Sequence, residues 1–301
     1  MTLPQLDAFG APAVPSGVAV LGIPASIGQL TAYHAQAVGE SRGTVLFVPG
    51  FTGSKEDFRD FLPLLSALGW DVWAYSQRGQ GDSVGPIGAG NYSLELFAAD
   101  VLEVAAIVGN GAPVHLLGHS FGGIVAPEAV IAHTEAFLSL TVLCSGPNGW
   151  AGRHAETSEI LAEGGSMGLW NRNNPHTVGQ ADELLTPDMA FLRLRAARTS
   201  SDNLRAGAYI LRTHVDRSVE IAAAGLPVLI AHGEFDDAWP IEAQRAMAVS
   251  IGASYHVIPG GAHSPQLEAP EATVAILDRF WANHQPAVGT SELQSTQQYK
   301  E

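Results

Sequence analysis

A serine that could act as a nucleophile lies between two glycines in the segment Gly118-His119-Ser120-Phe121-Gly122. An apolar run at 114–117 precedes it and an apolar helical pattern begins at Ile124, so we expect a strand, a sharp turn and a helix. A nucleophile on such a turn needs a strained backbone, and glycines two residues before and after it let the strand and the helix pass closely. The pattern predicts Ser120 as an exposed nucleophile; a chance Gly-Ser-Gly loop is the alternative.

A serine hydroxyl becomes an effective nucleophile when a base takes its proton and a carboxylate orients that base. The favoured base is His263, in a glycine-rich loop at 259–265 that follows a predicted strand at 254–258. Three other histidines are alternatives. His256 lies within that strand, His284 lies near the C-terminal tail, and His232 precedes the acid loop.

Candidate carboxylates for the orienting acid lie at 232–240, after a predicted strand at 226–231. Asp236 stands three residues after Gly233 and four before Pro240. We predict that Asp236 is the acid, and Glu234 and Asp237 are the alternatives in the same loop.

These segments together resemble the α/β-hydrolase fold superfamily. The branch concerned has a Gly-x-x-Asp-x-x-x-Pro acid loop and a Gly-x-x-His-x-x-x-x-Glu base segment. The matching residues here are Gly233, Asp236, Pro240, Gly260, His263 and Glu268. The order Ser120, Asp236, His263 is also the order that this fold uses. The resemblance covers roughly 40–146 and 225–282.

The resemblance also implies an oxyanion hole made by two backbone N–H groups. One belongs to Phe121, directly after the nucleophile, and we assign the other to Phe51, in the loop after the third strand. An ordinary core aromatic is the alternative for Phe51. The family usually has His before the glycine of this loop, where this chain has Pro49. A turn at 77–83 is similar to the family's Asp-x-Arg-Gly-x-Gly-x-Ser turn, with Gln77 in place of the acid, and is expected to shape the fold.

The remaining sequence predicts how these loops are positioned. Strands are expected at 17–23, 30–38, 44–48, 71–75, 114–117, 137–144, 226–231 and 254–258. They alternate with helical patterns, which is typical of a parallel sheet with right-handed crossovers. With the resemblance, the fold class is α/β: a mostly parallel eight-stranded sheet flanked by helices, with a helical cap inserted after the sixth strand. The predicted domains are a core at 1–146 and 225–284, a cap at 147–224 and a disordered tail at 285–301.

The alternation of strands and helices stops between 146 and 224, where helical patterns occur near 154–163, 180–198 and 202–221. In the resembled family such an insertion covers the active site. The predicted substrate-binding residues are Trp150, Met167, Trp170 and Met189, with Phe191 and Leu192 as further candidates. Five arginines could hold a substrate carboxylate: Arg193, Arg195, Arg198, Arg205 and Arg212. Core packing and solvated helix faces are the alternatives for these residues.

Composition narrows the possible partners. The 301 residues carry a formal net charge of −15, which argues against nucleic acid or an anionic membrane as partner. No stretch approaches the roughly 18 apolar residues of a membrane helix. A single cysteine, Cys144, rules out an intramolecular disulfide and suits a cytoplasmic location. We find no signal peptide, metal-ligand spacing, dinucleotide fingerprint or P-loop, so we expect no metal and no cofactor. Whether the protein forms a homodimer stays open.

The sequence therefore predicts a cofactor-free serine hydrolase that cleaves a small, apolar carboxylic ester, thioester or lactone. One alternative is a C–C bond hydrolase or a perhydrolase with the same triad. C–C hydrolases that cleave ring-fission products usually carry Trp directly after the base, where this chain has Ser264. Dehalogenases and epoxide hydrolases of this fold use Asp as nucleophile, which Ser120 argues against. A ligand-binding receptor that retains the triad is the alternative of another class.

Overall fold

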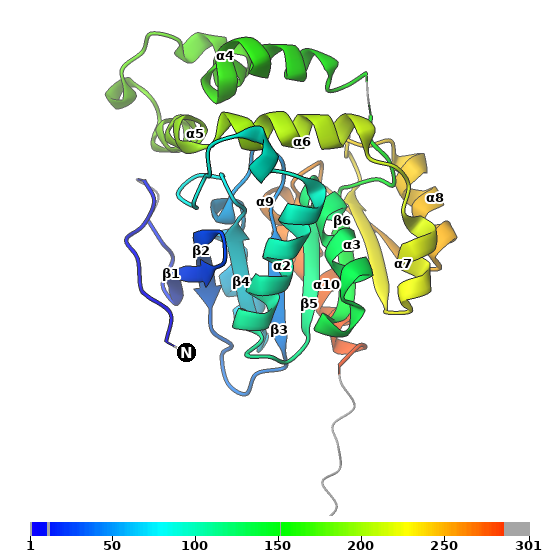
Figure 1. Ribbon diagram of the computed structural model, residues 1–301. Helices are drawn as coiled ribbons and strands as arrows, with labels where there is room; N and C mark the ends of the chain where they lie inside the picture. Colours follow the sequence, from blue (N-terminus) through cyan, green and yellow to red (C-terminus); the bar gives the residue numbers. More distant parts are fainter. Residues whose placement is uncertain (1, 11–12, 151, 286–301) are drawn as a thin grey trace, which may run out of the picture.

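The computed structural model describes residues 2–10, 13–150 and 152–285 (Figure 1). One twisted sheet forms the middle layer and helices cover both of its faces. The tail predicted at 285–301 lies outside the described residues except for Gln285. No helix among the described residues is long and apolar enough to cross a membrane.

Eight strands form the sheet in the order β1-β2-β4-β3-β5-β6-β7-β8. Their bounds are β1 Val18–Ala25, β2 Gly28–Ala35, β3 Thr44–Val48, β4 Asp71–Ser76, β5 Val114–His119, β6 Phe137–Leu143, β7 Val228–Gly233 and β8 Ser254–Ile258. Strand β2 pairs antiparallel with β1 and β4, and the other neighbours are parallel. All eight predicted strands are present, and the mostly parallel α/β fold is confirmed. Because β3 and β5 to β8 run parallel, their carboxyl ends meet at one edge of the sheet.

From β3 onward, helices alternate with the strands. Their bounds are α1 Leu62–Ser66, α2 Leu94–Val108, α3 Gly122–Ala132, α4 Ala155–Asn173, α5 Pro187–Arg198, α6 Ser201–Thr213, α7 Ser218–Ala224, α8 Ile241–Ile251, α9 Pro265–Glu268 and α10 Pro270–Ala282. Short 3-10 turns lie at Lys55–Phe58, Ala89–Asn91, Thr134–Ala136, Pro175–Thr177 and Asp182–Leu184. Apolar spacing over 55–68 predicts a helix that Pro63 kinks or breaks into two short pieces. The structure has two pieces there, Lys55–Phe58 and Leu62–Ser66, because proline fits the first turn of a helix but not its interior.

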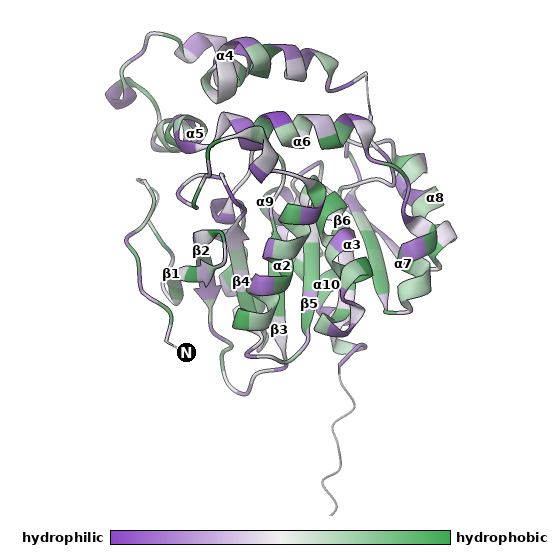
Figure 2. Ribbon diagram, viewed as in Figure 1, coloured by the Kyte–Doolittle hydropathy of each residue, from purple (hydrophilic) through white to green (hydrophobic). Residues whose placement is uncertain are grey.

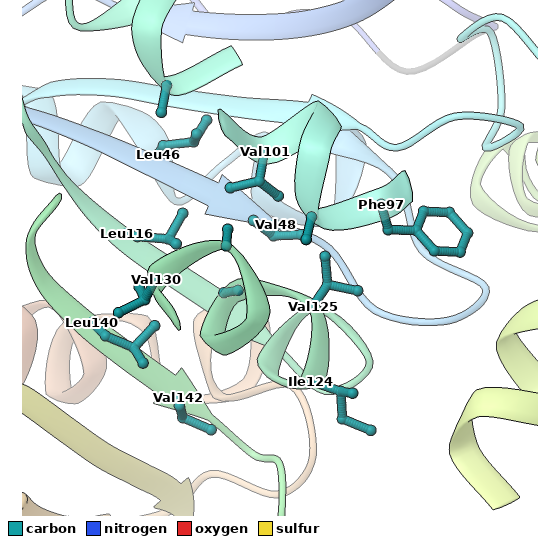
Figure 3. Packing of buried hydrophobic residues seen from close by; sticks show 14 of the residues in the cluster. Leu46, Val48, Phe97, Val101, Leu116, Ile124, Val125, Val130, Leu140 and Val142 are labelled. Carbon is teal, nitrogen blue, oxygen red and sulfur yellow. The ribbon is translucent and has the colours of Figure 1, made fainter. Parts of the chain in front are cut away.

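A hydrophobic core lies on each face of the sheet. On one face Leu46, Leu116 and Leu140 of the central strands pack with Val101 of α2 and Val125 of α3 (Figure 3). Figure 2 shows that the central strands are largely hydrophobic, whereas the helices carry both hydrophobic and hydrophilic residues. This packing fixes β5 and the start of α3, which carry the predicted nucleophile.

Helices α4, α5 and α6 lie above the sheet (Figure 1), and α4 and α6 share a small core of their own. That core consists of Leu161, Leu169, Leu204 and Ala208. Helix α7 falls within the span 147–224 that we predicted as cap, but it contacts α3 and α8 beside the sheet. Its Ile221 belongs to the main core, so the segment above the sheet ends before α7.

Candidate active site

The turn at Ser120 has the geometry that its sequence predicts. Ser120 follows β5 with φ of 54°, a left-handed conformation that costs a non-glycine residue about 1–3 kcal/mol. The flanking glycines permit this turn. A Cβ on Gly118 would lie 2.1 Å from the Gly122 carbonyl oxygen, and one on Gly122 would lie 2.2 Å from the Val48 oxygen. The half-buried Ser120 side chain therefore stands at the carboxyl edge of the sheet, in front of the first turn of α3.

The structure brings Ser120, His263 and Asp236 together in one hydrogen-bonded chain. Ser120 Oγ lies 3.0 Å from His263 Nε2, and His263 Nδ1 lies 3.0 Å from Asp236 Oδ1. Neither alternative acid makes this contact: Glu234 accepts from the Gly260 N–H, and the exposed Asp237 offers its backbone oxygen to Arg153. The alternative His232 bonds Tyr255 and the Gly233 carbonyl instead.

Asp236 is buried and accepts three hydrogen bonds. Besides His263, its Oδ1 accepts from the Ala238 N–H at 3.0 Å and its Oδ2 accepts from Gln244 Nε2 at 2.9 Å. Burial alone would raise the pKa of Asp236, but the hydrogen bonds from His263, Gln244 and Ala238 outweigh it and lower the pKa. The carboxylate therefore stays ionised behind the imidazole.

The His263 loop lies against the acid loop and is braced from within by Glu268. A Cβ on Gly233 would lie 2.1 Å from the Ala262 oxygen, so the two loops can meet because residue 233 is glycine. Glu268 Oε2 accepts from the N–H groups on either side of His263, those of Ala262 at 2.5 Å and Ser264 at 3.2 Å. The glycine and glutamate of the predicted motifs thus position the imidazole.

His119, the residue before Ser120, supports the same loop and was missed by sequence reasoning. Its Nε2 lies 2.7 Å from the His263 carbonyl oxygen. Burial and the neighbouring His263 lower the pKa of His119 to about 4, so the ring is neutral at ordinary pH. A neutral ring that donates from Nε2 ties the nucleophile turn to the base loop.

Two backbone N–H groups are available where the oxyanion hole was predicted. Within the described part of the chain, neither the Phe51 nor the Phe121 N–H donates a hydrogen bond to another group. The Phe51 loop is held from behind, because Gln77 Nε2 donates to the Pro49 oxygen at 3.0 Å and Gln80 Nε2 to the Gly50 oxygen at 2.8 Å. Gln77 and Gln80 thus hold the loop that carries one donor. When the family's turn is aligned on Arg78 and Ser83, its acid position falls on Ser76, so the assignment of that position to Gln77 was wrong.

A cavity of about 410 Å³ opens in front of Ser120 and His263. Its apolar lining includes Leu192 of α5, Leu211 of α6, Trp239 of the acid loop and Leu267 of α9, with Phe51 from the loop after β3. Its polar lining includes Arg153 and His154 at the start of α4. Burial, reinforced by Arg153, lowers the pKa of His154. The volume suits a small organic molecule.

The four residues predicted to bind substrate do not line this cavity. Trp150 lies beneath the Arg153 guanidinium, and Met167 and Met189 are half-buried elsewhere on α4 and α5. Trp170 lines a neighbouring cavity of about 200 Å³ that shares Thr52, Leu192 and Arg195 with the first. Of the two further candidates, Leu192 lines the Ser120 cavity, whereas Phe191 packs against Phe9.

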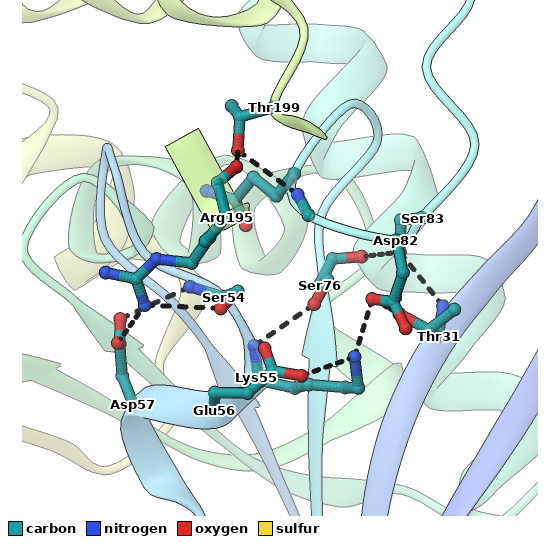
Figure 4. A network of polar contacts seen from close by, with 12 residues as sticks. Thr31, Ser54, Lys55, Glu56, Asp57, Ser76, Asp82, Ser83, Arg195 and Thr199 are labelled. Carbon is teal, nitrogen blue, oxygen red and sulfur yellow. Dashed lines mark hydrogen bonds and ion pairs between the residues drawn. The ribbon is translucent and has the colours of Figure 1, made fainter. Parts of the chain in front are cut away.

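Among the five arginines predicted as carboxylate ligands, Arg195 lines the Ser120 cavity. Its guanidinium is already paired, because Nη1 lies 2.5 Å from Asp57 Oδ1 and 3.3 Å from Ser54 Oγ (Figure 4). Arg193 pairs with Asp182, and Arg205 bonds Asp202 and the Leu161 oxygen. Arg212 contacts Ser158, and Arg198 is exposed.

One group in the described residues has metal-ligand spacing, namely His119, Cys144 and His263, whose donor atoms lie within 4.8 Å of one another. The two nitrogens of His263 are already bonded to Ser120 and Asp236. Burial and nearby Asp236 also raise the pKa of the Cys144 thiol well above its usual value, which disfavours the thiolate that a metal needs. These three residues therefore do not fit a metal site while the triad is assembled.

The sequence profile of the alpha/beta hydrolase family matches residues 45–276, so the chain belongs to the alpha/beta hydrolase family and is an enzyme. It is 25% identical to RutD of Variovorax paradoxus (strain S110), which bears the name of a carbamate hydrolase, over 81% of this chain and 93% of that protein. It is 30% identical to the pimeloyl-(acyl-carrier protein) methyl ester esterase of Methylococcus capsulatus, over 64% of this chain and 78% of that protein. A solved hydrolase structure from Pseudomonas aeruginosa PA01 shares the fold, with a TM-score of 0.72 at 21% identity over 87% and 98% of the two chains.

Proposed function

We propose that this enzyme is a cofactor-free serine hydrolase that cleaves a carboxylic ester, thioester or lactone through an acyl-enzyme on Ser120. The observation that carries the proposal is the hydrogen-bonded chain from Ser120 through His263 to Asp236, beside two uncommitted backbone N–H groups. The relatives named as a carbamate hydrolase and a methyl ester esterase support hydrolysis of an ester-like bond.

In the first half of the proposed reaction, Ser120 Oγ attacks the carbonyl carbon while His263 Nε2 takes its proton. Negative charge then develops on the carbonyl oxygen, and the Phe51 and Phe121 N–H groups stabilise it. The ionised Asp236 stabilises the imidazolium that forms. His263 next gives its proton to the departing alcohol or thiol, which leaves the acyl group on Ser120.

In the second half a water molecule takes the place of the leaving group. His263 accepts a proton from this water, whose oxygen attacks the acyl carbon of the Ser120 ester. When the second tetrahedral intermediate collapses, the acid leaves and the proton returns from His263 to Ser120 Oγ. In each half His263 thus first accepts a proton from the attacking hydroxyl or water and then donates it to the leaving group.

We also propose that helices α4 to α6 act as the cap of this site. Leu192 and Leu211 line the Ser120 cavity from α5 and α6, and with Trp239 and Leu267 they offer an apolar surface to the substrate. Trp170 would contact a longer acyl group that reaches the adjoining cavity. The proposed partner is a small molecule, with no role for nucleic acid, membrane or cofactor. A cytoplasmic location stays a prediction, and whether the protein forms a homodimer stays open.

The test compares wild type with Ser120→Ala on p-nitrophenyl acetate and butyrate. Loss of a triad nucleophile should lower kcat by at least about 10³-fold. Ser145→Ala is a matched control, because its buried hydroxyl has no hydrogen-bond partner in the described residues and lines neither cavity near Ser120. A Ser120→Ala variant that kept a tenth of the activity would exclude Ser120 as nucleophile. A wild type that binds but never turns over these esters would favour the receptor.

A further inference from the structure

The Ser120 cavity contains a cation that no acidic side chain in the described residues neutralises. Its lining includes two arginines and one carboxylate. That carboxylate, Asp57, is paired with Arg195. The exposed Arg153 has no carboxylate within ion-pair distance among the described residues, although the chain has 30 acidic and only 15 basic residues. An unneutralised guanidinium that lines a substrate cavity is placed to receive an anion.

Arg153 is held in place by neutral groups. Its Nη1 donates to the Asp237 carbonyl oxygen at 2.6 Å, and its guanidinium lies 5.2 Å from the centre of the Trp150 ring. Neither contact cancels its charge, and the Asp237 contact uses one of its five N–H donors. The carboxylate of Asp237 itself makes no ion pair with Arg153.

The chain around Trp150 is anchored on two sides. The Trp150 N–H donates to the Leu211 oxygen at 2.7 Å, which ties this segment to the end of α6. Trp239 Nε1 donates to the Asn148 oxygen at 3.3 Å, which ties it to the acid loop. Arg153 therefore has a defined position at the cavity wall, and His154 beside it adds a neutral polar ring to the same wall.

From these contacts we infer that Arg153 binds a carboxylate carried by the substrate, at the far end of its acyl group. The inference rests on the proposed function and narrows it to half-esters of dicarboxylic acids, or lactones and thioesters with a free carboxylate. Arg153 holds the carboxylate while the apolar wall with Leu192 and Leu211 covers the methylene chain. Because the chain as a whole is strongly negative, it repels anions, and Arg153 supplies the local positive charge that attracts the substrate carboxylate.

The kinetic test uses monomethyl esters of dicarboxylic acids from succinic to suberic, with methyl alkanoates of matching length. The readout is the ratio of kcat/KM for the half-ester to that for the neutral ester. Arg153→Gln should lower this ratio by about tenfold or more, because it removes a charge-assisted hydrogen bond. Arg212→Gln is the control: this arginine of α6 lines neither cavity near Ser120, and the ratio should not change. An unchanged ratio in Arg153→Gln would overturn the inference.

A binding measurement separates this inference from the proposed function. Adipate is titrated into Ser120→Ala with and without Arg153→Gln, and its binding is measured by calorimetry. We expect binding at least about tenfold weaker in the double variant. Equal affinity would refute the carboxylate site even if Ser120 proves to be the nucleophile. If wild type turns over no ester, the proposed function fails, and the titration still decides whether Arg153 binds a carboxylate.

Discussion

Replacing Asp236 with asparagine separates the charge of the triad acid from its geometry. In a triad of another hydrolase, this change costs about 10⁴-fold because the amide favours the wrong imidazole tautomer. Here Asp236 Oδ1 accepts from both His263 Nδ1 and the Ala238 backbone N–H. A backbone N–H cannot become an acceptor, so the side-chain amide of the variant should keep its oxygen at this position and preserve the correct tautomer of His263.

Gln244 favours the same orientation of the new amide. It now donates to Oδ2, and its own Oε1 is buried without a partner in the described residues. If the Gln244 amide flips, its oxygen can accept from the NH₂ group of the introduced asparagine. The substitution then removes mainly charge. Two charges 4 Å apart interact by about 4 kcal/mol at an effective dielectric constant of 20, and a neutral hydrogen bond retains part of this. We therefore expect Asp236→Asn to lower kcat by roughly 10²–10³-fold.

The assay is steady-state hydrolysis of p-nitrophenyl acetate, with Asp236→Ala as the variant that loses both charge and geometry. Asp236→Ala should have a clearly lower kcat than Asp236→Asn. Asp237→Asn and Glu234→Gln serve as controls in the same loop and should lose far less activity. A loss of 10⁴-fold or more in Asp236→Asn, equal to that of Asp236→Ala, would refute the argument that Ala238 fixes the amide.

Three further predictions follow from packing and burial. Gly118→Ala should destabilise the fold by about 3 kcal/mol or more in urea unfolding, because its Cβ would collide with the Gly122 oxygen; full stability would contradict the close approach. Burial lowers the pKa of His115 to about 4, whereas the unfolded chain protonates it near 6.5. The contribution of neutral His115 to the free energy of unfolding is therefore present above pH 6.5 and is lost as pH falls from 6.5 to 4. In His115→Gln the free energy of unfolding should decline less steeply over this pH range. Leu192→Ala should change the preference among ester chain lengths, while Met189→Ala should give a profile parallel to wild type. The opposite pattern would show that Met189 lines the pocket.

The positions of the proposed nucleophile, base and acid could be predicted because nearby glycines mark close approaches of the backbone. Gly118 and Gly122 border the serine turn, and Gly233 lets the acid loop touch the base loop. The strands could be predicted from apolar runs, although some of them end at other residues than predicted. β5 continues through Gly118 and His119, because both residues pair with β6.

Of the cavity wall only Leu192 and Arg195 were among the predicted substrate-binding candidates, because the rest depends on how three inserted helices pack. Helix α4 is interrupted at Gly165, which has a φ of 60°. The apolar pattern before Gly165 therefore does not predict which residues after it face the sheet. Met167 comes just after the break and Met189 lies on another helix. Arg153 precedes both α4 and the helical pattern near 154–163, so no periodicity marks it. Its proposed role rests on its contacts with Trp150 and with the Asp237 carbonyl oxygen of the acid loop.

The most direct test of the central claim is labelling with an alkyl fluorophosphonate, followed by intact-mass measurement and peptide mapping. We predict one label per chain, on Ser120, formed in step with the loss of ester hydrolysis. Ser120→Ala should take up no label, and Ser145→Ala should label like wild type. Full inactivation with the label on another residue, or continued turnover by a chain labelled at Ser120, would contradict the assignment of Ser120 as the nucleophile.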